Sequence, residues 1–255
     1  MQYLVSFSGG ITSWGAARRL IDQQGRDNVT LLFADTLIED PDLYRFIGDA
    51  VANLGVPFVR IAEGRDPWQV FTDKRYLGNT RIDPCSLVLK RQLLDSWRQE
   101  HFPGEDVTIV VGITWEEIHR LDAIKLRLAP DAILAPLCDS PYMNKTEVLN
   151  WARAEGLTPP RLYEMGFAHN NCGGFCIKQG QAGFANLLRH FPERYAYHEK
   201  QEESLRQMLD KDVAIMRDRR GGTTTPLTMK ALRERIESDE QIDMFDIGGC
   251  GCALD

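Results

Sequence analysis

The chain has 255 residues, of which 43% are hydrophobic and 26% charged, with a formal net charge of −7 and a pI of about 5.3. This composition is typical of a soluble globular protein with one large or two modest domains, and no apolar run is long enough to span a membrane. The acidic balance gives no overall attraction for nucleic acid, and we expect a cytoplasmic location.

The opening stretch predicts a strand, a tight turn and a helix. Residues 4–7 form an apolar run of strand length, the turn Ser8-Gly9-Gly10 follows, and apolar residues recur with helical spacing over residues 11–21. A glycine turn that leads into a helix leaves backbone N–H groups unpaired at the positive end of the helix dipole, which favours a phosphate. Three hydroxyl residues lie on the same rim: Ser8, Thr12 and Ser13.

Strands and helices alternate over the next hundred residues. Further apolar strands are predicted over residues 29–34, 57–61, 107–113 and 132–137, with a helix over residues 41–54. Near-continuous apolar strands between helices are typical of a parallel sheet that is covered on both faces. We therefore predict an α/β fold with a doubly wound, five-stranded parallel sheet, and we expect the ligand beyond the carboxyl ends of the strands.

Asp35 and Thr36 end the second predicted strand, on the same edge as the glycine turn. We expect both to bind nucleotide, while Asp35 also has an interpretation as a helix cap for the helix that begins near Pro41. Glu39 and Tyr44 are expected only as neighbours of this pair.

The segment from Arg65 to Trp97 interrupts the alternation and ends in a helix predicted over residues 87–97. Cys85 lies near the start of this helix, where the dipole and the cations Lys90 and Arg91 are expected to stabilise a thiolate. A structural interpretation, in which a buried cysteine lies beside two solvated cations, stays open.

A charged and aromatic cluster follows the fourth predicted strand, at residues 112–120. Arg120 is a candidate for bidentate phosphate binding, and Glu117 for holding Mg²⁺ or orienting Arg120. His119 is a weaker candidate, because a single histidine in a helix is usually structural. Cys138, among apolar residues after the fifth strand, is predicted to be a core residue.

A second motif lies at residues 162–180, where Cys172 and Cys176 flank two glycines in a tight loop. Such a loop suits two ligands of a metal ion or an Fe–S cluster, although the spacing is looser than in zinc ribbons. We predict a domain boundary just before it, at Thr158-Pro159-Pro160. Residues 1–158 are then a nucleotide-binding α/β domain, and residues 159–255 are a helical region that carries Cys172, Cys176, Cys250 and Cys252.

Helices are predicted for most of the C-terminal region, over residues 184–219 and 227–236. Arg217 to Arg220 form a basic patch before two glycines, which suits either a bound anion or a solvated loop. Near the end of the sequence, Cys250-Gly251-Cys252 lies on a glycine-rich tail, and its two thiols are candidates for a nucleophile or a further metal ligand.

Several of these stretches resemble the PP-loop ATP pyrophosphatases, the adenine nucleotide α-hydrolase-like superfamily, whose members cleave ATP between the α and β phosphates. Residues 8–13 resemble the SGGxxS signature of that superfamily, and residues 35–36 resemble the element after its second strand, with Leu37 where glycine is frequent. Residues 112–120 resemble the Gly-Ile…Glu-x-x-Arg element that faces the nucleotide in the family.

The cysteine-bearing stretches are similar to one branch of that superfamily. Residues 85–90 and 166–178 resemble segments of phosphoadenosine and adenosine phosphosulfate (PAPS/APS) reductases and their phage-encoded relatives. Ser86 stands where the APS reductases have the second cysteine of a pair that carries Fe–S ligands.

The resemblance implies an enzyme that uses ATP or a related adenine nucleotide together with Mg²⁺, and it leaves three functions open. The first is adenylylation of a substrate followed by sulfur transfer, supported by a [4Fe–4S] cluster, with zinc as the alternative. The second is a reductase in which a tail cysteine attacks the sulfuryl sulfur and a thioredoxin-like reductant completes the cycle. The third is a non-catalytic nucleotide-binding adaptor.

The predicted site residues follow from these interpretations. The predicted catalytic residues are Cys250, Cys252, Lys90 and Arg120. The predicted nucleotide-binding residues are Ser8, Gly9, Gly10, Thr12, Ser13, Asp35, Thr36 and Glu117. The predicted metal ligands are Cys85, Cys172, Cys176 and Cys250. Expected partners are a small-molecule or nucleoside-type substrate and a sulfur donor or thioredoxin-like reductant; nucleic acid is open but not favoured, no membrane contact is expected, and a homodimer is open.

Overall fold

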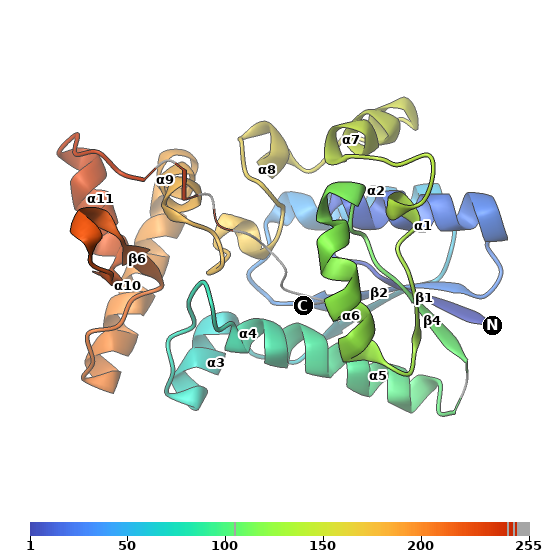
Figure 1. The fold of residues 1–255 in the computed structure, drawn as a ribbon, viewed down its shortest axis with the longest axis horizontal. Coiled ribbons are helices and arrows are strands. Elements are labelled where there is room, and N and C mark those ends of the chain that lie inside the picture. The colour runs from blue at the N-terminus through green and yellow to red at the C-terminus, as the bar shows by residue number, and fades with distance from the viewer. Residues whose placement is uncertain (105, 244, 247, 249–255) are drawn as a thin grey trace.

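The computed structural model describes residues 1–104, 106–243, 245, 246 and 248, and its main feature is a five-stranded sheet between layers of helices (Figure 1). Every strand pairing is parallel and the order is β3-β2-β1-β4-β5, which confirms the predicted doubly wound α/β fold. The strands are β1 (Gln2–Ser6), β2 (Val29–Asp35), β3 (Phe58–Ala62), β4 (Val107–Val110) and β5 (Ala132–Leu134).

Helices cover both faces of this sheet. On one face, α1 (Ile11–Gln24), α2 (Pro41–Leu54) and α7 (Lys145–Ala154) share a large apolar core with the inward side chains of β1 and β2. On the other face, α5 (Leu93–His101) packs on alternate residues of β1 and β2, and α6 (Leu121–Leu128) packs on residues of β4 and β5. Burial on both faces explains why the strands are apolar without a period-two alternation.

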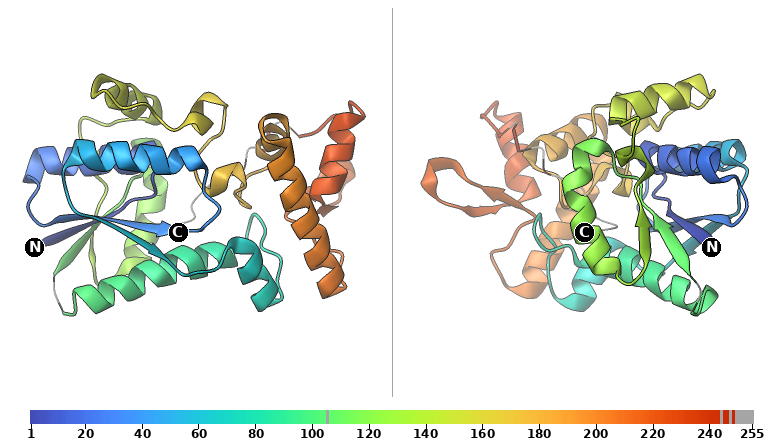
Figure 2. Two further views of the ribbon diagram at one scale, coloured as in Figure 1. Left: turned by 180° about the vertical axis from the view of Figure 1, so that it is seen from behind. Right: turned by 45° about the vertical axis from the view of Figure 1, so that its right-hand side comes forward.

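The C-terminal helices lie beyond the carboxyl edge of the sheet (Figure 2). They contain a second apolar core. It is formed by α8 (Arg161–Glu164), α9 (Gln181–His190), α10 (Pro192–Leu209) and α11 (Met229–Glu237), together with α3 (Pro67–Lys74). Helix α3 precedes the predicted boundary near residue 158 and yet packs in this core. The boundary therefore stays a prediction. No helix in the described ranges combines the length and apolarity that crossing a membrane requires.

Three predicted elements differ from the structure. The predicted fifth strand ends early, because the chain turns into the short helix η3 (Pro136–Cys138). The helical stretch predicted to reach residue 219 stops at Leu209, where Asp210 takes a left-handed conformation, and the antiparallel pair β6 (Met216–Asp218) and β7 (Thr225–Leu227) follows. The helix predicted from Leu87 begins earlier as α4 (Pro84–Ser86) and runs through a π-helix, η1 (Leu87–Gln92), into α5.

Glu202 of α10 holds two later segments of the C-terminal core together. Its buried carboxylate accepts hydrogen bonds from the backbone N–H groups of Ile215 at 3.0 Å and Met229 at 2.6 Å. Burial raises the pKa of Glu202 to about 7, despite these two donors. A carboxyl with a raised pKa in the folded state stabilises the fold less as pH rises through that pKa.

We expect the stability advantage of the wild-type protein over Glu202→Gln to fall by roughly 2–3 kcal/mol between pH 5 and pH 8. We compare the two proteins because His198 also makes stability depend on pH. Burial lowers its pKa to about 3, so its contribution rises with pH, but it is the same in wild type and variant and cancels in the difference. Urea unfolding of both proteins at pH 5, 6.5 and 8 measures the effect. A difference that does not change with pH would mean that Glu202 stays ionised in the folded state.

Candidate active site

The glycine turn, residues 8–10, joins β1 to α1 at the carboxyl edge of the sheet. Gly9 has a φ of 72°, and a Cβ there would lie 3.0 Å from side-chain atoms of Leu43 and Ile47. Gly10 is the N-cap of α1 and provides no side-chain acceptor, while Ser8 Oγ accepts from its N–H at 3.3 Å. The first-turn N–H groups of α1 therefore lie at the sheet edge, as the sequence predicts for a phosphate site.

Strand order reverses at β1, which has β2 on one side and β4 on the other. The chain leaving β4 comes so close to α1 that a Cβ on Gly112 would lie 2.5 Å from Ser13 Cα and 2.6 Å from Ser13 N. Only glycine fits this approach. It brings the helix η2 (Trp115–Arg120) to the same edge of the sheet as the glycine turn.

Glu117 and Arg120 form an ion pair on η2. The carboxylate of Glu117 also accepts from the Thr114 N–H at 3.4 Å, so both ends of this short helix are fixed. The contact required for Glu117 to orient Arg120 is present. Binding of Mg²⁺ by Glu117, and of phosphate by Arg120, stay predictions.

Asp35 ends β2 with a fully buried carboxylate. It accepts from the Leu37 N–H at 2.8 Å, from the Tyr44 hydroxyl at 3.0 Å and from Arg60 Nε at 2.8 Å. These contacts hold the turn after β2, in which Leu37 has a φ of 63°, so leucine here adopts the left-handed conformation that glycine favours. The contact of Asp35 with nucleotide stays a prediction.

A small cavity, which we call the thiol cavity, lies at the same edge and has a volume of about 20 Å³. It brings Cys85 together with Cys172 and Cys176, which lie in a loop far along the sequence from it. Its lining residues are Thr36, Pro67, Cys85, Ser86, Lys90, Cys172, Phe175, Cys176 and Ile177.

Glu39 connects the turn after β2 to this cavity. It accepts from the Thr36 hydroxyl at 2.8 Å and from the backbone N–H of Cys172. Burial raises the pKa of Glu39, while the charge of Lys90 and these hydrogen bonds act against the rise. Lys90 is itself only 6% exposed and projects from the π-helix η1, a backbone form that often marks functional sites.

The expected thiolate at Cys85 is wrong for this structure. Burial raises the pKa of the Cys85 thiol to about 12, the charge of Asp83 adds to the rise, and Lys90 opposes it only in part. Arg91, the second cation expected to help, instead pairs with Asp83 at 3.4 Å. The sequence shows the cations and the helix start, but not the burial that outweighs them.

The described thiols lie near one another, but their arrangement does not by itself indicate a cluster site. Binding a [4Fe–4S] cluster requires at least three thiolates that point at one centre. Cys85, Cys172 and Cys176 share a cavity, yet the described residues include no group of three His, Cys, Asp or Glu side chains placed to hold a metal ion. A volume of about 20 Å³ suits a water molecule rather than a cluster. Cluster and zinc binding therefore stay predictions, and Cys250 and Cys252 lie outside the described residues.

The cysteine loop, residues 169–176, is fixed to the C-terminal core. Phe175 stacks on His198 with 3.6 Å between ring centroids, and the Trp68 indole N–H donates to His198 Nδ1 at 2.9 Å. Gly173 has a φ of 57°, and a Cβ there would lie 2.7 Å from the Ile38 carbonyl oxygen. The loop is thus held between α10 on one side and the turn after β2 on the other.

Sequence analysis missed Asp40, which joins four segments. It caps α2 by accepting from the Asp42 N–H at 2.9 Å, and its buried carboxylate accepts from Arg161 at 2.8 and 2.9 Å and from Arg194 at 3.1 Å. Arg194 also donates to the carbonyl of Gly173 in the cysteine loop. The sequence did carry a signal for the capping role of Asp40, because an aspartate directly before a proline at the start of a predicted helix is typical of an N-cap.

Sequence analysis also missed Tyr163 and Lys145. The Ile11 N–H, in the first turn of α1, donates to the Tyr163 hydroxyl at 3.2 Å. Lys145 Nζ lies 4.4 Å from the centroid of the Tyr163 ring and donates to the Ala168 carbonyl. No local pattern marks either residue, because the contact spans 152 positions in sequence.

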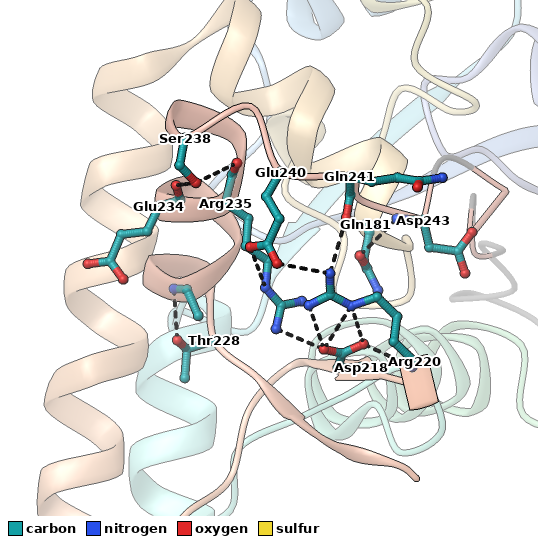
Figure 3. A network of polar contacts seen from close by, with 11 residues as sticks. Gln181, Asp218, Arg220, Thr228, Glu234, Arg235, Ser238, Glu240, Gln241 and Asp243 are labelled. Carbon is teal, nitrogen blue, oxygen red and sulfur yellow. Dashed lines mark hydrogen bonds and ion pairs between the residues drawn. The ribbon is translucent and has the colours of Figure 1, made fainter. Parts of the chain in front are cut away.

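The basic patch at residues 217–220 is neutralised in part by neighbouring carboxylates (Figure 3). Arg220 donates to Asp218 at 3.1 Å and to Glu240 at 3.3 Å, and Arg235 also pairs with Asp218, at 2.8 Å. These ion pairs favour a structural role for Arg220 over the grip on an anion that the sequence left open.

Comparisons with known proteins concern the fold. No protein-family model matches the chain, and no curated protein matches it. One similar solved structure is a phosphoadenylyl-sulfate (PAPS) reductase from Candida auris in a phosphate complex, with a TM-score of 0.44 and 14% identity over 66% of this chain and 79% of that one. Another is an NH3-dependent NAD synthetase from Campylobacter jejuni in complex with nitrate, with a TM-score of 0.39 and 14% identity over 95% and 88%.

Proposed function

We propose that this chain is a PP-loop enzyme that binds ATP or a related adenine nucleotide, activates a substrate by adenylylation and transfers sulfur to it at the thiol cavity. One observation carries the proposal: the glycine turn and the thiol cavity lie at the same carboxyl edge of the sheet. Thr36, which directly follows β2, the strand next to β1, lines that cavity and donates to Glu39, and Glu39 accepts from the Cys172 N–H.

The phosphate end of the site is built from backbone. Charge that develops on phosphate oxygens is best stabilised by donors that are already in place, and the first turn of α1 supplies these at the glycine turn. Ser8 and Ser13 add hydroxyl groups at the same position, and Arg120 supplies a positive charge from η2. A substrate oxygen bonds to the α-phosphorus here as the bond to the β-phosphate breaks and pyrophosphate leaves.

The thiol end supplies sulfur. A persulfide on one cavity cysteine, loaded by an external sulfur donor, attacks the activated carbon, and AMP leaves with the oxygen and its electron pair. A second cavity cysteine then attacks the sulfur of the first, which releases the thiolated product and leaves a disulfide that an external reductant reopens. Lys90 and Glu39 place a buried amine and a buried carboxyl beside this chemistry.

Nucleotide turnover is the direct test. The full chain, purified without oxygen, is assayed for ATP binding by calorimetry and for pyrophosphate release with candidate nucleoside acceptors and a persulfide donor. Pyrophosphate release that needs the acceptor, together with a thiolated product whose formation needs Cys172, supports the proposal. Cys138→Ser is the matched control, since Cys138 lies in another apolar core and its thiol donates to the backbone carbonyls of Ile113 and Thr114. Absence of any binding of adenine nucleotide overturns it.

The same preparation distinguishes the alternatives. Sulfite release from PAPS with a thioredoxin-like reductant identifies a reductase, for which three thiols beside the buried cation Lys90 are also suited. ATP binding without turnover, unaffected by cysteine substitution, identifies an adaptor. Iron and zinc analysis of the anaerobic protein tests the predicted cluster.

A further inference from the structure

The Tyr163 hydroxyl occupies a position that the proposed nucleotide site needs. Its oxygen accepts from the Ile11 N–H at 3.2 Å, and a Cβ on Gly10 would lie 3.3 Å from it. Ile11 is the first residue of α1, so its N–H is among the donors without a partner inside the helix. A phosphate oxygen bound to this N–H would take the place of the tyrosine oxygen.

Lys145 lies on the face of the Tyr163 ring, whose hydroxyl accepts from the Ile11 N–H. Its ammonium contacts the Tyr163 ring face at 4.4 Å and donates to the carbonyl of Ala168. Helix packing fixes this arrangement, because α7 approaches α1 so closely that a Cβ on Gly15 would lie 2.7 Å from Val148. Lys145 lies one turn before Val148 and begins α7, so the packing holds it beside the first turn of α1.

A second feature, in the segment whose carbonyl Lys145 contacts, points to a ligand. Asn170 lies two residues beyond Ala168 and is 1% exposed, yet neither amide atom has a hydrogen-bond partner among the described residues. Leaving a buried carboxamide without partners is costly, so such a group normally meets a ligand or an ordered water. The segment that Lys145 contacts therefore carries a buried amide that is able to meet a polar ligand.

We propose that Tyr163 and Lys145 form an exchangeable cover over the phosphate site. In the nucleotide-free protein the Tyr163 hydroxyl takes the place of a phosphate oxygen. When ATP binds, the hydroxyl leaves the Ile11 N–H, and the Lys145 ammonium turns from Ala168 to the β- and γ-phosphates. This inference rests on the proposed nucleotide site. It gives the binding of the leaving pyrophosphate to Lys145, and not to Lys90 or Arg120.

The proposal predicts that substitutions of Lys145 and Tyr163, which touch in the structure, change the affinity for ATP in opposite directions. Lys145→Gln should weaken binding of ATP and of inorganic pyrophosphate by roughly tenfold or more, because a charge-assisted hydrogen bond is lost, and should leave AMP binding within about twofold. Tyr163→Phe should tighten ATP binding by roughly 2- to 10-fold, because it removes the competing acceptor. Damage to the fold would weaken both.

Calorimetric titration of the full chain with ATP, AMP and pyrophosphate measures these constants. Lys145→Arg should keep most of the affinity, and Lys211→Gln, which removes an exposed lysine beyond α10, should change nothing. If wild type binds ATP but Lys145→Gln binds it equally well, or Tyr163→Phe binds it more weakly, the inference fails while the proposed function stands. If wild type binds no adenine nucleotide, the proposed function itself fails. Should Lys145→Gln not fold, the Arg and Phe variants still decide between these outcomes.

Discussion

Substituting Gly112 by alanine is expected to lower the free energy of unfolding by roughly 2–4 kcal/mol and to weaken ATP binding at least tenfold. The added Cβ would lie 2.5 Å from Ser13 Cα and 2.6 Å from Ser13 N, and both of these are backbone atoms that cannot rotate away. The chain after β4 and the first turn of α1 must therefore separate. That first turn carries the proposed phosphate donors, so stability and affinity should fall together.

Gly48→Ala is the matched control for this substitution. Gly48 lies within α2, where a new Cβ would meet no atom within 4 Å, so alanine there should stabilise the helix by roughly 0.5–1 kcal/mol. Urea unfolding and calorimetric titration with ATP measure both variants. A Gly112→Ala protein with wild-type stability and affinity would show that β4 and α1 are not in the contact described.

Removal of Asp40 should loosen the attachment of the C-terminal part to the sheet. Asp40→Ala deletes the cap of α2 and the acceptor for Arg161 and Arg194, and we expect a loss of roughly 2–3 kcal/mol in unfolding free energy. The expected loss is moderate because Arg161 and Arg194 are partly exposed, so water solvates their guanidinium groups once the carboxylate is removed. Proteolysis should become faster between residues 158 and 176, which these contacts hold.

Two variants separate the contributions at Asp40. Asp40→Asn keeps a cap acceptor but loses the charge, so it should cost less than alanine. Asp49→Ala removes an exposed partner of Arg45 in the same helix and should cost under about 0.5 kcal/mol.

The effect of Asp40 should also depend on pH. Burial raises the pKa of Asp40, but hydrogen bonds from Arg161, the Asp42 N–H and Arg194 outweigh burial and hold it below the ordinary value of 3.8. The stability from its charge is present above that pH and is lost below it, so wild type and Asp40→Asn should converge as pH falls below 3.8. Equal stability of the two at neutral pH would show that the ion pairs contribute nothing.

The fold was predictable because its signals are local. The apolar strands, the glycine turn and the helix over residues 41–54 each follow from neighbouring residues, and the helix is found with the predicted bounds. The pair β6 and β7 was missed because two strands of three residues carry almost no periodic signal.

The site was predictable only in part. Residues of the glycine turn lie together because they are consecutive. Cys85 lines the same cavity as Cys172 and Cys176, and the sequence pattern predicts these three as candidate metal ligands. The contacts of Asp40, Lys145 and Tyr163 depend on tertiary packing and left little trace in the sequence. The raised pKa of Cys85 could not be predicted for the same reason, since the degree of burial is a property of the whole fold.

The π-helix η1 makes the position of Lys90 sensitive to chain length. In a regular α-helix each residue turns the chain by about 100°, so deleting one residue from the wide turn before α5 would rotate everything on its N-terminal side by about that amount. Lys90 would then no longer face Glu39, although α5 would keep its own packing on the sheet. A single-codon deletion in this segment would thus disturb both the surroundings of Lys90 and the packing of Val88 and Leu89 against Val70, while α5 stays in place.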